Sequence, residues 1–241
     1  MPQLSSHELE KTSARGIVWN EIDSIFLDMD GTLLDLRFDN YFWAEYIPHY
    51  YAKVQGLELH EAKKRISALR PGQPGTLDWY SLDLWSEVLD MQLGLLQEEM
   101  AHLIRVHDGV LQVLEDMRKM KKRLVLVTDA HPAVLRLKLE HTELEAYFDA
   151  IFSAHEIGVS KENPGFWCSL AEKESFNPAR TLLVDDTPAI LDAAQQHGIF
   201  CLRQVLKPDS EQPAQQAGAF PAVQAFTELA PNSIPISLYS K

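Results

Sequence analysis

Four short apolar runs, each ending at or just before a polar residue, restrict this chain to a small set of folds. They lack the polar alternation of a half-exposed strand, and their β-branched and aromatic composition is typical of parallel strands buried on both faces. Helical patterns separate the runs, and this alternation predicts right-handed βαβ units in a doubly wound α/β sheet. The predicted strands are 24–27, 124–127, 150–153 and 181–184, and the predicted helices are 110–120, 133–141, 165–174 and 190–197.

The segment 39–105 interrupts this alternation. It predicts helices at 41–54, 59–69, 79–91 and 97–104 with no strand between them, and the Pro-Gly-Gln-Pro-Gly stretch 71–75 is an irregular connection. An all-helical insertion directly after the first strand is typical of a cap over the active site. We therefore predict a catalytic core of residues 1–38 and 106–206 and a helical cap of residues 39–105. Residues 207–241 are expected to form a loosely ordered tail with at most one short helix, at 222–229.

Composition limits the possible partners. The 241 residues are 46% hydrophobic, which suits one compact domain with an inserted module. The net charge of -13 argues against nucleic-acid or anionic-membrane binding, because both need a basic face. Residues 1–14 lack the features of a signal peptide and no apolar run is long enough to span a bilayer, so a cytoplasmic location is expected. Cys168 and Cys201 lie within apolar patterns, which indicates buried free thiols rather than a zinc site or a disulfide.

Asp28 and Asp30 close the first predicted strand in the sequence Asp-Met-Asp-Gly-Thr, residues 28–32. In an extended Asp-x-Asp both side chains point the same way, so one can attack phosphorus while the other reaches the bridging oxygen. Asp28 is the predicted nucleophile. Asp30 is the predicted acid and base, which protonates the leaving alkoxide and then deprotonates the water that hydrolyses the aspartyl-phosphate. Gly31 permits the sharp exit that such a strand end needs.

A carboxylate and a phosphate repel each other unless a hard cation bridges them. Asp185 and Asp186 supply further carboxylates at the fourth predicted strand end, and Mg²⁺ prefers such oxygen ligands. Thr128 ends the second strand, where its hydroxyl can hold a phosphoryl oxygen, and Lys161 follows the third and supplies positive charge to the transition state. Ligands of doubly wound sheets bind beyond the carboxyl ends of the strands, so we expect these side chains to meet there.

Each motif also has a purely structural interpretation. Residues 28–32 alone are compatible with an ordinary turn, Asp185 and Asp186 with a helix N-terminus, and Thr128 or Lys161 with a structural or solvated role. The order of the motifs after successive strands favours catalysis. His131 precedes a proline and is interpreted as packed or hydrogen bonded. Aromatic residues at helical spacing in the cap are more typical of core than of base stacking, although one or two can do both. They are Tyr41, Phe42, Trp43, Tyr46, Trp79, Tyr80 and Trp85.

The four motifs, in this order, resemble those of the haloacid dehalogenase (HAD) phosphatases over residues 20–205. The resemblance implies the roles above, a HAD-like core with an all-helical cap inserted after the first motif, and Mg²⁺ as cofactor. It also implies that Mg²⁺ is bound by Asp28, the backbone carbonyl of Asp30, and the Asp185–Asp186 pair, with Asp186 favoured as the direct ligand. Dehalogenases lack an aspartate two residues past the nucleophile and P-type ATPases carry threonine there, so Asp30 points to a phosphatase.

Longer strings outside these motifs are similar to the bacterial GMP/IMP nucleotidase group. They are 33–36, 38–43, 79–87, 130–132 and 138–142. The resemblance implies a 5'-nucleotidase with a small-molecule partner, a purine nucleoside monophosphate, bound by Asp30, Thr128, Asp129 and Lys161. Asp129 stands where the group has asparagine, and a carboxylate beside the phosphate pocket is expected to weaken substrate binding unless Asp129 is protonated, rotated away or paired with Lys161. The alternatives are a broad sugar-phosphate phosphatase, a phosphomutase, or a non-catalytic HAD module that binds a partner, although a binding module does not need every charged participant.

Overall fold

The computed structural model describes residues 16–231 and contains one parallel sheet. The strand order is β3-β2-β1-β4-β5-β6, so the chain adds β2 and β3 on one side of β1 and then crosses to the other side for β4 to β6. The strands are β1 (Ser24–Leu27), β2 (Arg123–Thr128), β3 (Ala150–Ser153), β4 (Thr181–Asp185), β5 (Cys201–Val205) and β6 (Ala222–Val223). The predicted α/β doubly wound sheet is confirmed, and its switch point lies between β1 and β4.

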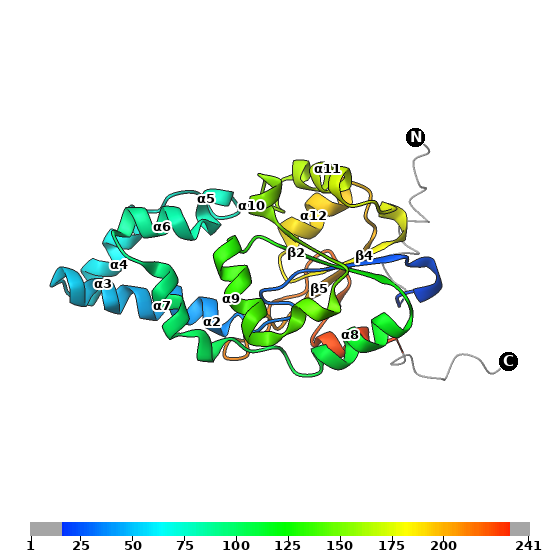
Figure 1. Cartoon of the computed structure of the whole chain (residues 1–241), viewed down its shortest axis with the longest axis horizontal. Coiled ribbons are helices and arrows are strands. Elements are labelled where there is room, and N and C mark those ends of the chain that lie inside the picture. The colour runs from blue at the N-terminus through cyan, green and yellow to red at the C-terminus, as the bar shows by residue number, and fades with distance from the viewer. Residues whose placement is uncertain (1–15, 232–241) are drawn as a thin grey trace.

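Helices cover both faces of the sheet, which explains why the strands read as continuous apolar runs. In β1, Ile25 and Leu27 join one buried cluster and Phe26 joins the other. α8 and α9 lie on the first face, whereas α10 to α12 lie on the second (Figure 1). Their bounds are α8 (Val110–Lys119), α9 (Pro132–Thr142), α10 (Ala154–Ile157), α11 (Pro164–Lys173) and α12 (Pro188–Gln196). Short 3-10 turns connect the elements at η1 (Trp19–Glu21), η4 (Leu144–Tyr147) and η5 (Pro178–Arg180).

The chain between β1 and α8 is helical, and its helices project from one end of the sheet (Figure 1). They pack around a third buried cluster that includes Phe42, Ile47, Trp85 and Leu93. The elements are α2 (Arg37–Tyr41), the π-helical η2 (Phe42–Tyr46), α3 (Ile47–Gln55), α4 (Leu59–Ala68), α5 (Leu77–Tyr80), α6 (Leu82–Leu89), α7 (Leu93–Glu99) and η3 (Ala101–Leu103). The predicted helix 79–91 is broken because Ser81 caps α6, and the one predicted at 97–104 begins earlier, at Leu93, and ends as a 3-10 turn.

The segment after β5 contains more structure than its composition predicts. The short helix expected at 222–229 is present only as the 3-10 turn η6 (Phe226–Leu229), preceded by β6, and η6 buries both of its terminal side chains against α8. Asn40 Nδ2 donates to Asp209 Oδ2 at 2.6 Å, which ties this segment to α2. Residues 207–221 are irregular, as expected, whereas residues 222–229 pack on the core as β6 and η6. Residues 232–241 of that predicted tail, and residues 1–14, lie outside the described residues.

Two further sequence expectations need correction. β5 was not predicted because Arg203 and Gln204 interrupt its apolar pattern, although both side chains are buried. Cys168 is exposed and Cys201 half-buried, so the thiols are free but not both buried as expected. Across residues 16–231, none of the helices combines the length and the apolar character needed to cross a membrane.

Candidate active site

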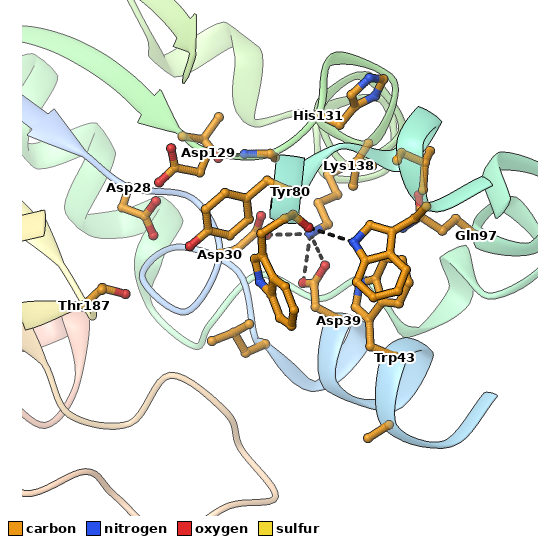
Figure 2. Close-up of a pocket in the computed structure, with 18 of the residues that line it drawn as sticks. Asp28, Asp30, Asp39, Trp43, Tyr80, Gln97, Asp129, His131, Lys138 and Thr187 are labelled. Carbon is orange, nitrogen blue, oxygen red and sulfur yellow. Dashed lines mark hydrogen bonds and ion pairs between the residues drawn. The ribbon is translucent and has the colours of Figure 1, made fainter. Parts of the chain in front are cut away.

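The predicted site residues line one cavity of about 490 Å³ at the carboxyl ends of the strands (Figure 2). Its other wall comes from the helices between residues 37 and 103, so the cavity lies between the sheet and the helical insertion. Its volume is in the range of small-molecule sites. The predicted residues that line it are Asp28, Asp30, Thr128, Asp129, Lys161, Asp185 and Asp186.

Lys161 joins the ends of β1, β2 and β4. It lies in the loop between α10 and α11, and its Nζ donates to Asp28 Oδ1 at 2.6 Å, to Asp185 Oδ2 at 2.9 Å and to the Val127 carbonyl at 3.1 Å. Burial alone would lower the pKa of Lys161, but Asp185, Asp28 and Asp129 raise it well above its ordinary value. The ammonium is therefore charged and fixed beside the predicted nucleophile.

The carboxylates at this end of the sheet outnumber the ammonium that faces them. Burial, aided by Asp185 and Asp186, raises the pKa of Asp28 well above its usual range despite Lys161. Burial and the neighbouring Asp185 raise the pKa of Asp186 to about 7. Asp28 Oδ2 is buried without a hydrogen-bond partner in the part of the chain that the structure describes. Both observations fit a site that a cation completes.

Asp28, Asp185 and Asp186 each offer a carboxylate oxygen within 4.8 Å of the other two. This donor set consists of hard oxygens, which fits a divalent cation such as Mg²⁺ or Ca²⁺ better than a softer metal. Both oxygens of Asp185 are already engaged, since Oδ1 accepts from the Thr187 amide at 2.9 Å and Oδ2 from Lys161. Asp186 Oδ2 receives no hydrogen bond from the described residues, so it is the freer ligand of the pair.

Gly31 permits Asp186 to lie close to the loop that follows β1. Its φ of +84° lies in the left-handed region, and a Cβ at this position would lie 2.9 Å from Asp186 Oδ2. Any side chain here would therefore displace the carboxylate. The sharp turn expected at Gly31 is present.

Thr128 and Asp129 hold the loop after β2. Thr128 Oγ1 accepts from the Ala130 amide at 3.0 Å, which leaves its hydroxyl hydrogen available to a ligand. Asp129 Oδ1 accepts from the backbone amide of Lys161 at 2.9 Å. Burial, opposed by Lys161 and reinforced by Glu162, raises the pKa of Asp129 to about 7. Asp129 is therefore paired with Lys161 through the backbone amide rather than the ammonium, and its raised pKa also favours the protonated form near neutral pH.

Within the described residues, Asp30 makes no side-chain hydrogen bond or ion pair with Asp28 or Lys161. Instead, Lys138 Nζ donates to Asp30 Oδ1 at 2.7 Å and to both oxygens of Asp39 at 2.7 and 2.8 Å (Figure 2). Burial raises the pKa of Asp39 to about 6 against the opposing effect of Lys138. The sequence did not predict that Lys138 and Asp39 form a hydrogen-bonded cluster with Asp30. The available signal was Lys138 itself, a charge three residues after Leu135 on an otherwise apolar helix face.

Two polar contacts join the helical insertion to the loop that carries Lys161. Tyr80 donates its hydroxyl hydrogen to Glu162 Oε1 at 2.7 Å, and Ser160 donates to the Gly75 carbonyl at 2.7 Å. His131 caps α9 and lies 3.4 Å from Asp83 through Nε2. The expectation that His131 is a packed or hydrogen-bonded residue is therefore met.

The fold and the family comparison define a class of enzyme. A model of the haloacid dehalogenase-like hydrolases matches residues 22–198, and the chain belongs to this family. Within the family it is a phosphatase.

Individual relatives indicate which phosphatases this chain resembles most in sequence and in fold. The GMP/IMP nucleotidase YrfG of Escherichia coli (strain K12) is 39% identical over 217 residues, which cover 90% of this chain and 97% of that protein. The pyrimidine 5'-nucleotidase YjjG of the same strain is 29% identical over 182 residues, 68% of this chain and 77% of that one. The solved HAD phosphatase of Thermococcus onnurineus has a TM-score of 0.73 at 20% identity, with 86% of this chain and 96% of that chain covered, and shares the fold.

Proposed function

We propose that the protein is a Mg²⁺-dependent 5'-nucleotidase that removes phosphate from purine nucleoside monophosphates, GMP and IMP in particular. The observation that carries the proposal is the contact of Lys161 with Asp28 and Asp185 inside the cavity. The similarity to a GMP/IMP nucleotidase over 90% of the chain supports the substrate class. The proposal includes a cytoplasmic location.

The reaction proceeds in two steps through an aspartyl-phosphate. A carboxylate oxygen of Asp28 attacks the phosphorus, the bond from phosphorus to the 5' oxygen breaks, and the carboxyl proton of Asp30 passes to the departing nucleoside oxygen. Water then attacks the phosphorus, Asp30 accepts a proton from this water, and the bond to Asp28 breaks to release inorganic phosphate. Asp30 regains its proton in the second step, so the cycle consumes one water and returns the enzyme unchanged.

The remaining site residues hold the phosphoryl group and the cation. Lys161 and the Thr128 hydroxyl bind phosphoryl oxygens, while Asp129 fixes the loop of Lys161 through the backbone amide. Asp28, the Asp30 backbone carbonyl and Asp186 would hold Mg²⁺, with Asp185 beside them as a supporting carboxylate. Bound Mg²⁺ neutralises the repulsion between the carboxylates and the phosphate. The engaged oxygens of Asp185 and the free oxygen of Asp186 support this division.

Residues 39–105 act as the cap that selects the substrate, because the core residues address only phosphate and metal. The cap wall of the cavity carries Trp43, Trp79, Tyr80 and Trp85, whose rings offer stacking surface for a base (Figure 2). Gln97 also lines the cavity, is 3% exposed, and has no side-chain hydrogen bond within the described segment. Its amide matches the carbonyl and N–H that guanine and hypoxanthine share.

A substrate panel tests the function. With Mg²⁺, GMP and IMP should give a higher kcat/KM than CMP and UMP, because a larger ring stacks over more of the aromatic cap wall, and chelation with EDTA should remove the activity. Phosphate release is the measurement. A preference for sugar phosphates, or isomerised product with a long-lived phosphoenzyme, would replace the nucleotidase assignment with one of the alternatives.

Trp43→Ala tests base stacking by the cap. Trp43 lies half-buried on the cavity wall, and its ring centroid is 5.0 Å from the ring centroid of Trp85. Loss of one stacking ring should raise the KM for GMP by an amount that corresponds to about 1–3 kcal/mol of lost binding free energy. The KM for β-glycerophosphate should change little. Trp19→Ala, distant from the cavity, is the matched control. Equal losses on both substrates would show that Trp43 is only part of the cap core.

A further inference from the structure

Within the described residues, the side chain of the buried lysine on α9 donates only to two carboxylates. Lys138 is 1% exposed, and its ammonium donates to Asp30 Oδ1 and to both oxygens of Asp39. An ammonium has three hydrogens, and these three bonds use all of them. Lys138 therefore has no donor left for a substrate, although it lines the cavity.

The three side chains come from separate parts of the fold. Asp30 lies in the loop after β1, Lys138 on α9 of the core, and Asp39 on α2, the first helix of the insertion (Figure 2). The Lys138 ammonium also lies 5.2 Å from the Phe38 ring centroid. Burial of a charge is costly unless it is paired, so the interior holds this ammonium only while both carboxylates are in place.

The hydrogen bond from Lys138 engages one oxygen of the Asp30 carboxylate and leaves the other oxygen available. Oδ1 is held by Lys138, whereas Oδ2 receives no hydrogen bond from residues 16–231 and Asp30 faces the cavity. A carboxylate with one fixed oxygen has a defined side-chain orientation and can still exchange a proton through the other oxygen. Catalytic groups need such support from their neighbours to stay within productive geometry.

We propose that Lys138 is a positioning residue that fixes the orientation of Asp30 and, through Asp39, couples it to the first helix of the cap. The inference rests on the proposed role of Asp30 as acid and base. Displacement of α2 would remove two of the three hydrogen bonds of the ammonium. Asp30 is therefore held in its working orientation only when α2 is docked on the core.

A double-mutant cycle tests the coupling. Lys138→Met, a substitution of similar length without charge, should lower kcat on GMP and on β-glycerophosphate by about 10–100-fold with a smaller change in KM. In the Asp30→Asn background the same substitution should lower kcat by less than about threefold, because the group that Lys138 positions is already inactive. Lys122→Met, a partly buried lysine near the opposite end of the sheet, is the matched control and should leave kcat unchanged in both backgrounds.

Asp39→Asn gives a second, milder test if Lys138→Met does not fold. This variant keeps the size and an acceptor for Lys138, and should lower kcat severalfold in the wild-type background but not in the Asp30→Asn background. Equal losses in both backgrounds, for either substitution, would show a structural role and overturn the inference. A fully active Asp30→Asn enzyme would instead overturn the acid and base assignment, and preserved coupling on β-glycerophosphate without activity on GMP would overturn only the nucleotide specificity.

Discussion

Asp28→Asn should abolish phosphate release, with kcat reduced by about 10⁴-fold or more, because a carboxamide cannot form the aspartyl-phosphate. The substitution keeps the shape of the side chain and removes one charge from a crowded group of carboxylates. Asp28 Oδ1 receives a hydrogen bond from Lys161 at 2.6 Å, and the amide oxygen can still accept it. The measurement is single-turnover and steady-state phosphate release from GMP.

A measurement of thermal stability distinguishes loss of the nucleophile in Asp28→Asn from misfolding of the variant. The raised pKa of buried Asp28 means that the native state binds its proton more tightly than the unfolded chain does. The carboxylate therefore opposes folding increasingly as the pH rises above the ordinary aspartate pKa, and the neutral amide removes this opposition. In EDTA, Asp28→Asn should match or exceed the wild-type Tm at pH 8. Asp23→Asn, at the other end of β1, is the control that should retain activity; turnover in Asp28→Asn equal to that control would refute the nucleophile.

The buried parallel strands were the most predictable part of the fold. β1 and β3 begin and end at the predicted residues, and β2 and β4 extend one or two residues further. Their central side chains alternate between two buried clusters, so these positions are apolar on both faces and the signal is strong. β6 has two residues and depends on pairing with β5. A strand of this length has no periodicity to detect.

The polar cluster at the carboxyl ends of the strands was predictable because each strand positions its own polar residue. Asp28, Thr128 and Asp185 follow from the strands alone, since the carboxyl ends of parallel strands meet at one edge. Asp39 and Lys138 depend on tertiary packing. They are 99 positions apart in the chain, and only the docking of α2 against α9 brings them together. A local pattern cannot report such a pair.

The loop that carries Lys161 is anchored on two sides, and Asp129 supplies one of the two contacts. Asp129 accepts from the Lys161 amide, and Glu162, the next residue, accepts from Tyr80 of the insertion. The loop that carries Lys161 is thus held from the core on one side and from the insertion on the other. A carboxylate at position 129 stabilises this loop through a backbone hydrogen bond, which an asparagine oxygen can also accept.

Asp30→Asn should lower kcat on GMP by about 10²–10⁴-fold, because the variant loses both the proton donor to the nucleoside oxygen and the base that activates water. The loss on p-nitrophenyl phosphate should be smaller, since p-nitrophenolate departs with little protonation. An alkoxide leaving group depends on Asp30 in both steps, whereas the phenolate depends on it mainly in hydrolysis of the aspartyl-phosphate.

A pre-steady-state experiment separates the two steps. With p-nitrophenyl phosphate, Asp30→Asn should release a burst of p-nitrophenol equal to the enzyme concentration and then turn over slowly, because the aspartyl-phosphate forms but is hydrolysed poorly. GMP should give no burst, since its first step is already slow without the acid. The hydrogen bonds of Asp30 favour this result: it faces the cavity and is held by Lys138, and within the described residues it has no hydrogen bond to Asp28 or Lys161, so its replacement leaves the contact between the nucleophile and its ammonium in place. Equal losses on both substrates without a burst would contradict the acid role, because the effect would then be independent of the leaving group.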